Sequence, residues 1–279
     1  MKKIISLILM LTLLCATMLT SCTLFGSGDN GPVAKIIDVK LTDEEYAFVC
    51  KKGNTDLVNS FNTFLAEIKE NGTFDTLVNK YFKGEGEKVG YDVTTTDVQN
   101  TESNLIVATN CPFEPFEYIG NDGKIYGLDI EIAAAYAKAN NLTLVVKNIG
   151  FDDIFTQVEA GYADIGMAGM TVTEDRAGYL FTDKYYNASL NIIVAADNTD
   201  FDNCQTAEDV EAVLAALEGK KVGYQTGTTS VDYVGGFANI EGKGYDTAAL
   251  AAYDVINGNI YAVVVDNAPA AAIVDSYNK

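Results

Sequence analysis

The sequence predicts an α/β protein with two lobes, each built on a mainly parallel sheet flanked by helices. From residue 105 onward, short apolar runs of strand length alternate with amphipathic stretches of helical length, a pattern typical of parallel sheets. The chain has 279 residues, which suits two domains or one two-lobed body. Hydrophobic residues make up 48% of the sequence, so a core of ordinary size is expected.

The first 21 residues are predicted to be a targeting signal rather than part of the fold. Two lysines are followed by an apolar stretch at 4–19, which is short for a membrane-spanning helix. The sequence Leu-Thr-Ser-Cys at 19–22 resembles the lipobox of bacterial lipoproteins, in which the cysteine carries the lipid. We therefore expect Cys22 to be lipidated; an ordinary signal peptide with a chance cysteine is the alternative.

Composition excludes several classes of function. The 39 acidic and 19 basic residues give a net charge of −20, which disfavours nucleic acid as a partner. The chain has no histidine, the commonest general base and metal ligand. Cys50, Cys111 and Cys204 fit no metal-ligand spacing and are expected to be free or buried thiols. We expect no metal, no cofactor and no catalytic centre.

The segment before residue 105 predicts two strands, two helices and a linker. Strands are expected at 36–39 and 47–50. Apolar residues at helical spacing predict a helix that begins near Asn54 and ends at Asn71, and a second apolar face covers 74–82. The stretch 83–103 is rich in Gly, Thr, Asp and Asn and predicts a linker.

The remaining elements follow the alternation of strands and helices. Strands are predicted at 105–108, 142–146, 163–167, 190–195, 221–224 and 261–265. Helices are predicted at 128–139, 152–160, 207–217, 230–237, 248–257 and 268–277.

Five fragments carry a specific family resemblance. They are VATNCPFEPFEYIGNDGKIYGLDIEIA (107–133), FDDIFTQVEAGYADIGMAGMTVTEDRA (151–177), FTDKYY (181–186), LEGKKVGYQTGTTS (217–230) and NGNIYAVVVDNAPAA (257–271). In this order they resemble the amino-acid-binding proteins of bacterial ABC transporters, which are family 3 solute-binding proteins with a type II periplasmic-binding-protein fold. The resemblance implies a monomer that closes on a free amino acid and delivers it to a permease, outside the cytoplasmic membrane.

The two ends of the chain depart from that family's order. In the family, the helix that resembles 267–278 is followed by a strand, a second crossover, a lobe-one strand and a helical pair. Here the chain stops at Lys279, whereas 34–82 resemble that missing block. The sequence therefore predicts a circular permutation, in which the linker joins the family's old ends. A truncated tandem duplication with domain swapping between chains is the alternative.

The permutation sets the predicted domain boundaries. They are a signal peptide at 1–21, a tether at 22–32, lobe one at 46–187 with the linker 83–103, and lobe two at 33–45 plus 190–279. Two crossovers, near 45–47 and 188–191, would form the hinge. The ligand is expected between the lobes, at the carboxyl ends of the strands.

The resemblance implies residues that bind the ligand's carboxylate. Arg176 is the only arginine in the chain, and its guanidinium can donate two parallel hydrogen bonds to a carboxylate. Gly169 would add a backbone donor and Thr171 a hydroxyl. Thr228 and Thr229 open a helix whose N–H groups would point at an anion. A surface ion pair of Arg176 and simple N-capping by the threonines are the alternatives.

The ammonium and the side chain of the ligand have their own predicted partners. Asp266 ends a strand and would meet the ammonium, unless it only caps the following helix. Phe113 and Phe151 would sandwich the side chain, although phenylalanine is often a core residue. Asn110 and Glu114 would contact the end of the ligand's side chain. Asn110 is uncharged, which counts against a strictly cationic ligand and favours a polar one.

An enzyme on the same fold is the main alternative function. The family's relatives include a dehydratase of cyclic acids, which needs an acid or base placed in the cleft. Glu114 and Asp266 are the candidates in this sequence. A sensor domain and a surface protein that no longer transports are less favoured by the sequence.

Overall fold

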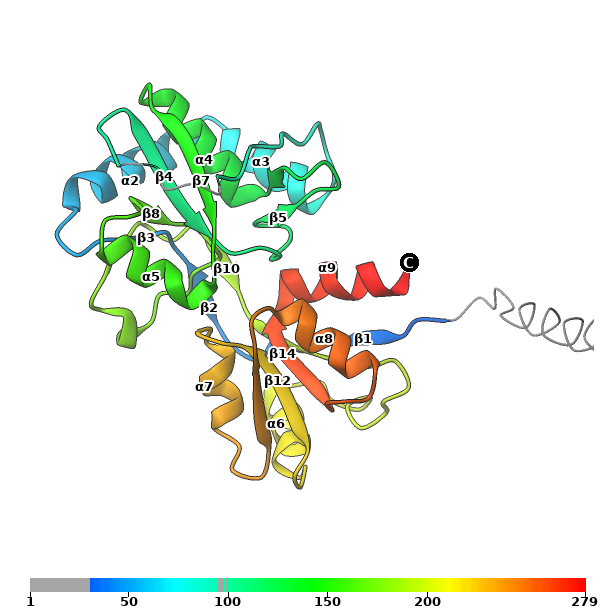
Figure 1. Cartoon of the computed structure of the whole chain (residues 1–279). Coiled ribbons are helices and arrows are strands. Elements are labelled where there is room, and N and C mark those ends of the chain that lie inside the picture. Colours follow the sequence, from blue (N-terminus) through cyan, green and yellow to red (C-terminus); the bar gives the residue numbers. More distant parts are fainter. Residues whose placement is uncertain (1–30, 95–97, 99) are drawn as a thin grey trace, which may run out of the picture.

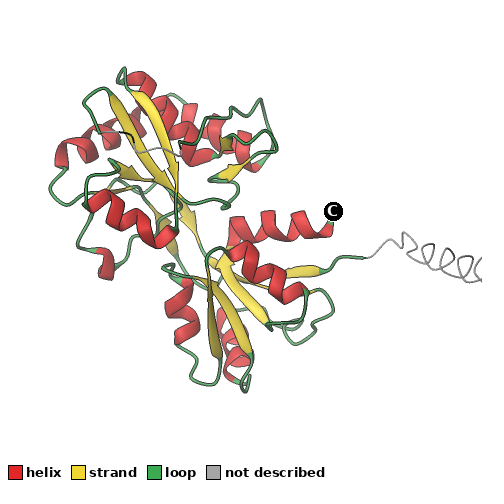
Figure 2. Ribbon diagram, in the orientation of Figure 1, coloured by secondary structure: helices red, strands yellow, loops and turns green. Residues whose placement is uncertain are grey.

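The computed structural model describes residues 31–94, 98 and 100–279. It shows two lobes, each with a five-stranded sheet flanked by helices (Figures 1 and 2). The predicted signal peptide and Cys22 lie outside the described residues. No helix in the described part of the chain is long and apolar enough to cross a membrane.

The sheet of lobe one has the order β7-β4-β8-β3-β9. Its strands are β3 (Val49–Cys50), β4 (Asn104–Thr109), β7 (Thr143–Asn148), β8 (Ile165–Gly166) and β9 (Leu180–Phe181). The other elements are helices α2 (Thr55–Glu70), α3 (Thr73–Phe82), α4 (Leu128–Ala139) and α5 (Phe151–Glu159), the hairpin β5 (Tyr118–Ile119) and β6 (Ile125–Tyr126), and the 3₁₀ turn η1 (Glu174–Arg176).

The sheet of lobe two has the order β1-β11-β14-β12-β13. Its strands are β1 (Ala34–Ile37), β11 (Leu190–Ala195), β12 (Lys221–Gln225), β13 (Glu241–Tyr245) and β14 (Ala262–Asp266). Its helices are α6 (Ala207–Ala215), α7 (Ser230–Gly235), α8 (Ala248–Ile256) and α9 (Asn267–Asn278).

Both sheets are mixed, which corrects the prediction of mainly parallel sheets. In lobe one, β3 pairs antiparallel with β8 and β9, whereas β4 pairs parallel with β7 and β8. In lobe two, β11 pairs antiparallel with β1 and β14, whereas β12 pairs parallel with β13 and β14. Strand β3 follows the hinge strand β2 (Glu44–Tyr46), and β11 follows the hinge strand β10 (Tyr186–Ala188), so each runs from the hinge into its lobe, opposite to its neighbours.

The predicted two-strand hinge is confirmed. Strand β2 (Glu44–Tyr46) pairs antiparallel with β10 (Tyr186–Ala188), and Tyr186 faces Tyr46 in the register. Figure 1 shows these two strands running together between the lobes. A rotation of the lobes about this narrow ribbon would leave both sheets intact.

The segment 34–82 is an integral part of the body. It supplies β1 to the edge of one sheet and β3 to the interior of the other. Its helices pack on α4, where the Phe61 and Tyr136 rings stack with centroids 3.9 Å apart. Lys80 and Glu131 form a largely buried ion pair at 2.6 Å. Removing this segment would take strands from both sheets and expose the apolar face of α4.

The start of β1 and the end of α9 are joined by hydrogen bonds. The Asn278 Oδ1 accepts from the backbone N–H of Val33 at 2.8 Å, and its Nδ2 donates to the Ala34 carbonyl at 2.9 Å. Figure 1 shows the C-terminus beside β1. Few residues would therefore be needed to connect the end of α9 to the start of β1.

Candidate ligand-binding site

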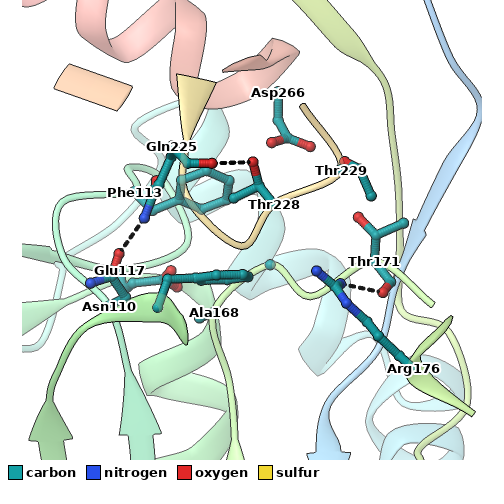
Figure 3. A pocket seen from close by; sticks show the side chains of 12 residues that line it. Asn110, Phe113, Glu117, Ala168, Thr171, Arg176, Gln225, Thr228, Thr229 and Asp266 are labelled. Atoms are coloured by element: carbon teal, nitrogen blue, oxygen red, sulfur yellow. Dashed lines mark hydrogen bonds between the residues drawn. The ribbon is translucent and has the colours of Figure 1, made fainter. Parts of the chain in front are cut away.

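One cavity lies between the two lobes and gathers most of the predicted site residues (Figure 3). It holds about 330 Å³ that no protein atom occupies, part of it open to solvent. It is lined by Asn110, Phe113, Glu117, Phe151, Ala168, Gly169, Thr171 and Arg176 of lobe one and by Gln225, Thr228, Thr229 and Asp266 of lobe two. All the predicted ligand-binding residues except Glu114 are among them.

Strand ends position these side chains. Asn110 follows β4, Gln225 ends β12 and Asp266 ends β14, while Thr171 lies just beyond β8. The carboxyl ends of strands in open α/β sheets form a crevice, and here two such crevices face each other. The cavity therefore receives side chains from segments that are far apart in the sequence.

Arg176 is a buried cation with no carboxylate partner in the part of the chain that the structure describes. Its Nη1 donates to the Thr171 carbonyl at 2.6 Å, and its Nη2 donates to the Gly227 carbonyl of lobe two at 2.8 Å. Burial lowers the pKa of the guanidinium, and nearby acids oppose this shift. The predicted alternative, a surface ion pair with Glu174 or Asp175, is not formed. The guanidinium is thus available to an anion in the cavity.

Asp266 is the buried acid of lobe two. The Tyr46 hydroxyl donates to its Oδ1 at 2.6 Å. Burial raises the pKa of Asp266 to about 7, with a further contribution from the negative charge of Glu44. The Asp266 side chain makes no cap hydrogen bond to α9, so the capping alternative is not realised. A cation in the cavity would favour the ionised form of this carboxyl.

Gly169 occupies a position that only glycine fills without strain. Its φ is +56°, and a Cβ there would lie 2.5 Å from Cε1 of Phe113. Its N–H donates to Asp129 at 3.3 Å, so the donor predicted for the ligand is already engaged. Gly169 therefore shapes the wall of the cavity and lets the Phe113 ring approach.

The hydroxyls of the threonines have protein partners as well. Thr228 Oγ1 donates to the Gln225 carbonyl at 2.8 Å. Thr171 and Thr229 each donate to the carboxylate of Glu44, at 2.6 and 2.8 Å. Thr229 is the N-cap residue of α7, but its side chain makes no cap bond.

The far end of the cavity carries a carboxyl that sequence reasoning missed. Glu117 has 0% exposure, and both of its carboxyl oxygens are without a hydrogen-bond partner among the described residues. Burial raises its pKa well above the ordinary value, and the nearby charge of Asp129 adds to the effect. In Figure 3, Glu117 and Asn110 lie at one side of the cavity and Arg176 at the other. A buried carboxyl without a partner is costly, and such residues are enriched at functional sites, so Glu117 is a candidate for contact with a ligand.

Beside Glu117, a cross-lobe hydrogen bond closes the cavity. The Gln225 Nε2 of lobe two donates to the Asn110 Oδ1 of lobe one at 2.8 Å, and the Asn110 Nδ2 donates to the Ile149 carbonyl at 2.7 Å. Together with the bond from Arg176 to Gly227, this contact must break if the lobes separate. The described conformation is therefore a closed one.

Glu114 lies outside the cavity, which corrects its predicted placement. Its side chain is 44% exposed and lies 3.8 Å from Lys88 Nζ. The chain turns tightly here, with the Phe113 N–H donating to the Glu117 carbonyl at 2.7 Å. This turn directs Glu117 inward and Glu114 outward, so Glu117 takes the position that the sequence analysis gave to Glu114.

Fold and site together define a two-lobed binding protein, with a hinge of two strands and a cavity between the lobes that carries both polar and aromatic side chains. The profile of the bacterial extracellular solute-binding proteins, family 3, matches residues 105–261. The match covers more than half of the chain, and the chain belongs to this family. The expected family and fold are thus confirmed.

Curated relatives carry names of amino-acid-binding proteins. A "probable histidine-binding protein" of Neisseria gonorrhoeae is 30% identical over 172 residues, which are 60% of this chain and 60% of that relative. An arginine-binding extracellular protein of Bacillus subtilis is 31% identical over 131 residues, 47% of each chain. In sequence order, the chain therefore spans 60% or less of these two relatives.

Solved structures that resemble this chain also carry names of amino-acid-binding proteins. The holo form of an arginine-binding protein of T. maritima is 30% identical with a TM-score of 0.56, over 62% of this chain and 74% of that chain. An ancestral arginine-binding protein bound to arginine is 34% identical with a TM-score of 0.56, over 63% and 76%. An ancestral amino-acid-binding protein described as a precursor of cyclohexadienyl dehydratase is 30% identical, with the same TM-score.

Proposed function

We propose that this protein captures a free amino acid between its lobes and delivers it to the permease of an ABC transporter. The observation that carries the proposal is one cavity with the unpaired guanidinium of Arg176 and the carboxyl of Asp266 on its wall. A zwitterionic amino acid presents a carboxylate and an ammonium at a fixed separation, which these two groups complement. Arg176 would hold the carboxylate and Asp266 the ammonium.

Glu117 favours a ligand with a cationic side chain. Its buried carboxyl has no partner among the described residues, and a guanidinium, ammonium or imidazolium would supply both the opposite charge and the donors. Asn110 lies at the same end of the cavity, where its side chain accepts a hydrogen bond from Gln225. The names of the relatives, arginine- and histidine-binding, agree with this class. It differs from the expectation from the sequence, in which uncharged Asn110 counted against a strictly cationic ligand.

Capture would proceed by rotation about the β2/β10 ribbon. The contacts from Gln225 to Asn110 and from Arg176 to Gly227 join the lobes in the closed form. When the lobes part, these contacts are exchanged for water and the cavity opens to the ligand. The closed form then presents both lobes of a monomer to the permease.

The lipid anchor remains a proposal. Cys22 would carry the lipid and hold the body at the outer face of the cytoplasmic membrane, through residues 22–32. Replacement of Cys22 by serine should release the protein from the membrane fraction and abolish labelling by a radioactive fatty acid. Unchanged labelling of that variant would remove Cys22 from the proposal.

Circular permutation is supported by the arrangement of the chain. The segment 34–82 completes both sheets, although it precedes the region that matches the family. Asn278 at the end of α9 bonds to the start of β1, where a family member with the usual order would continue directly. The family match in sequence order covers only part of each relative because the remaining block lies at the front.

A binding role is preferred over catalysis, although one structural neighbour is described as a precursor of a dehydratase. The relatives named above are binding proteins. Incubation of the protein with its ligand, followed by mass spectrometry, should return the ligand chemically unchanged. Turnover of the ligand would overturn this part of the proposal.

A thermal-shift screen against the twenty amino acids tests the function directly. A ligand that binds only the folded state raises the melting temperature with concentration. Arginine, lysine or histidine should give the largest shift, and glutamine a smaller one. The absence of any shift, together with no heat of binding in calorimetry, would contradict the proposal.

A further inference from the structure

Glu44 is a buried carboxylate that holds two hydroxyls of the cavity wall. It lies on the hinge strand β2 and is 6% exposed. Its Oε2 accepts from Thr171 of lobe one at 2.6 Å, and its Oε1 accepts from Thr229 of lobe two at 2.8 Å. Thr171 and Thr229 line the cavity, whereas Glu44 lies behind them.

These two bonds fix the direction of both hydroxyls. An ionised carboxylate can only accept hydrogen bonds, and a threonine hydroxyl has a single proton to donate. With both protons turned toward Glu44, Thr171 and Thr229 present only lone pairs to the cavity. They can therefore accept from a ligand's ammonium but cannot donate to its carboxylate.

The charge of Glu44 acts in the same direction. It lies close enough to Asp266 to raise the pKa of that carboxyl, after burial has done so. A second negative charge behind the wall stabilises a cation on the cavity side and repels an anion. Arg176 is the only cation that faces the cavity in the described part of the chain.

We propose that Glu44 is a positioning residue that makes this end of the cavity selective for an α-ammonium group. It turns the hydroxyls of Thr171 and Thr229 into acceptors and adds a negative charge behind them. The inference rests on the proposed function and refines it: the ligand is required to carry an amino group beside its carboxylate, and Glu44 enforces this without touching the ligand.

The test compares each amino acid with the analogue that lacks its α-amino group. The probes are arginine against 5-guanidinopentanoic acid, and glutamine against 4-carbamoylbutanoic acid, measured by calorimetry. The native protein should prefer the amino acids. In Glu44→Gln, the amide can donate to one threonine, which frees that hydroxyl proton for a carboxylate. The preference should therefore fall by about tenfold or more.

Glu45→Gln is the matched control. Glu45 is the next residue on β2, its side chain is 47% exposed, and it pairs with Lys184 on the surface. The control changes the net charge equally but should leave the preference unchanged. If Glu44→Gln weakens the amino acids and their des-amino analogues equally, so that the ratio of their affinities is unchanged, the role of Glu44 is overturned. Failure of the native protein to bind any of the four probes would instead overturn the proposed function itself.

A second pair of variants keeps the test decisive if Glu44→Gln folds poorly. Thr229→Val removes one of the two acceptors and should reduce the preference for the amino acid, whereas Thr229→Ser should restore it. The same preference in both variants would show that the hydroxyl has no part in recognising the amine. Melting curves of each variant verify that the fold is retained.

Discussion

Tyr46 donates a hydrogen bond from its hydroxyl to the Asp266 carboxylate at 2.6 Å, although 220 residues separate them in the sequence. Tyr46 comes from the hinge strand of the front segment, and Asp266 ends a strand near the opposite end of the chain. The front segment therefore contributes directly to the electrostatics of the cavity.

Ligand affinity should depend on pH through Asp266. Its pKa is raised to about 7 in the ligand-free protein, whereas a bound ammonium requires the ionised carboxylate. Below pH 7, binding must release a proton, so affinity falls as pH falls; above the pKa it levels off. Glutamine is the probe, because its uncharged side chain does not require an ionised Glu117, and calorimetry should show about tenfold weaker binding at pH 6 than at pH 8. An affinity that is constant over this pH range would show that Asp266 does not bind the ligand's ammonium.

The Tyr46→Phe variant should move that pH dependence upward. The hydroxyl stabilises the carboxylate, so its loss raises the pKa of Asp266 further. Affinity at pH 7 should fall several-fold, while affinity at pH 9 should approach that of the native protein. A uniform loss at every pH would indicate damage to packing rather than a shifted titration.

Arg176→Ala should abolish tight binding. The ligand carboxylate would be buried without its partner, at a cost of roughly 3–5 kcal/mol, which is a loss of hundreds-fold or more. Arg176→Lys keeps the charge but not the two parallel donors, and we expect it to restore only part of the affinity. Near-native affinity of the alanine variant in calorimetry would remove Arg176 from the site.

Glu117→Gln should change which side chain is bound. Arginine affinity should fall by about tenfold or more because the buried partner loses its charge, whereas glutamine affinity should be kept or should rise. Glu114→Gln is the control, since Glu114 faces solvent beside Lys88. Equal effects of Glu117→Gln on both ligands would argue against recognition of a cationic side chain.

A rearranged chain tests the permutation. It begins at residue 100, runs to 279, continues through a short linker into residue 33 and ends at 94. Because Asn278 already bonds to Val33, this join should be unstrained. Circular dichroism and ligand affinity should match those of the native protein, and light scattering should show a monomer for both. A native dimer that exchanges 34–82 between copies would support the swapped alternative.

The sequence predicted most of the long elements because their patterns are local. Helix α4 and strand β11 have the bounds that periodicity predicted, and α2 ends before Asn71-Gly72 as expected. Strand β13 was missed, since its sequence EGKGY lacks β-branched residues and its side chains are largely outside the core. The two-residue strands of the hairpin β5/β6 are too short to show a period.

The site was predicted less completely, for a physical reason. Residues next to recognisable motifs, such as Arg176 and Asp266, were found, and their roles remain predictions. Glu44 has no local signal, because its partners Thr171 and Thr229 lie 127 and 185 residues away. Glu117 shares the motif FEPFE with Glu114, and only the turn determines which carboxyl faces inward.

The placement of β3 also governs the order in which the polypeptide can fold as it is synthesised. Cys50 pairs with Ile165 and Leu180, so this interior strand emerges long before either neighbour exists. Until then, Phe48 lacks the later residue Tyr185 and Phe61 lacks the later residue Tyr136, on which they stack in the folded protein, and contacts between such distant residues form slowly. While the chain is being synthesised, the front segment should therefore depend on chaperones more than it would if it were synthesised last.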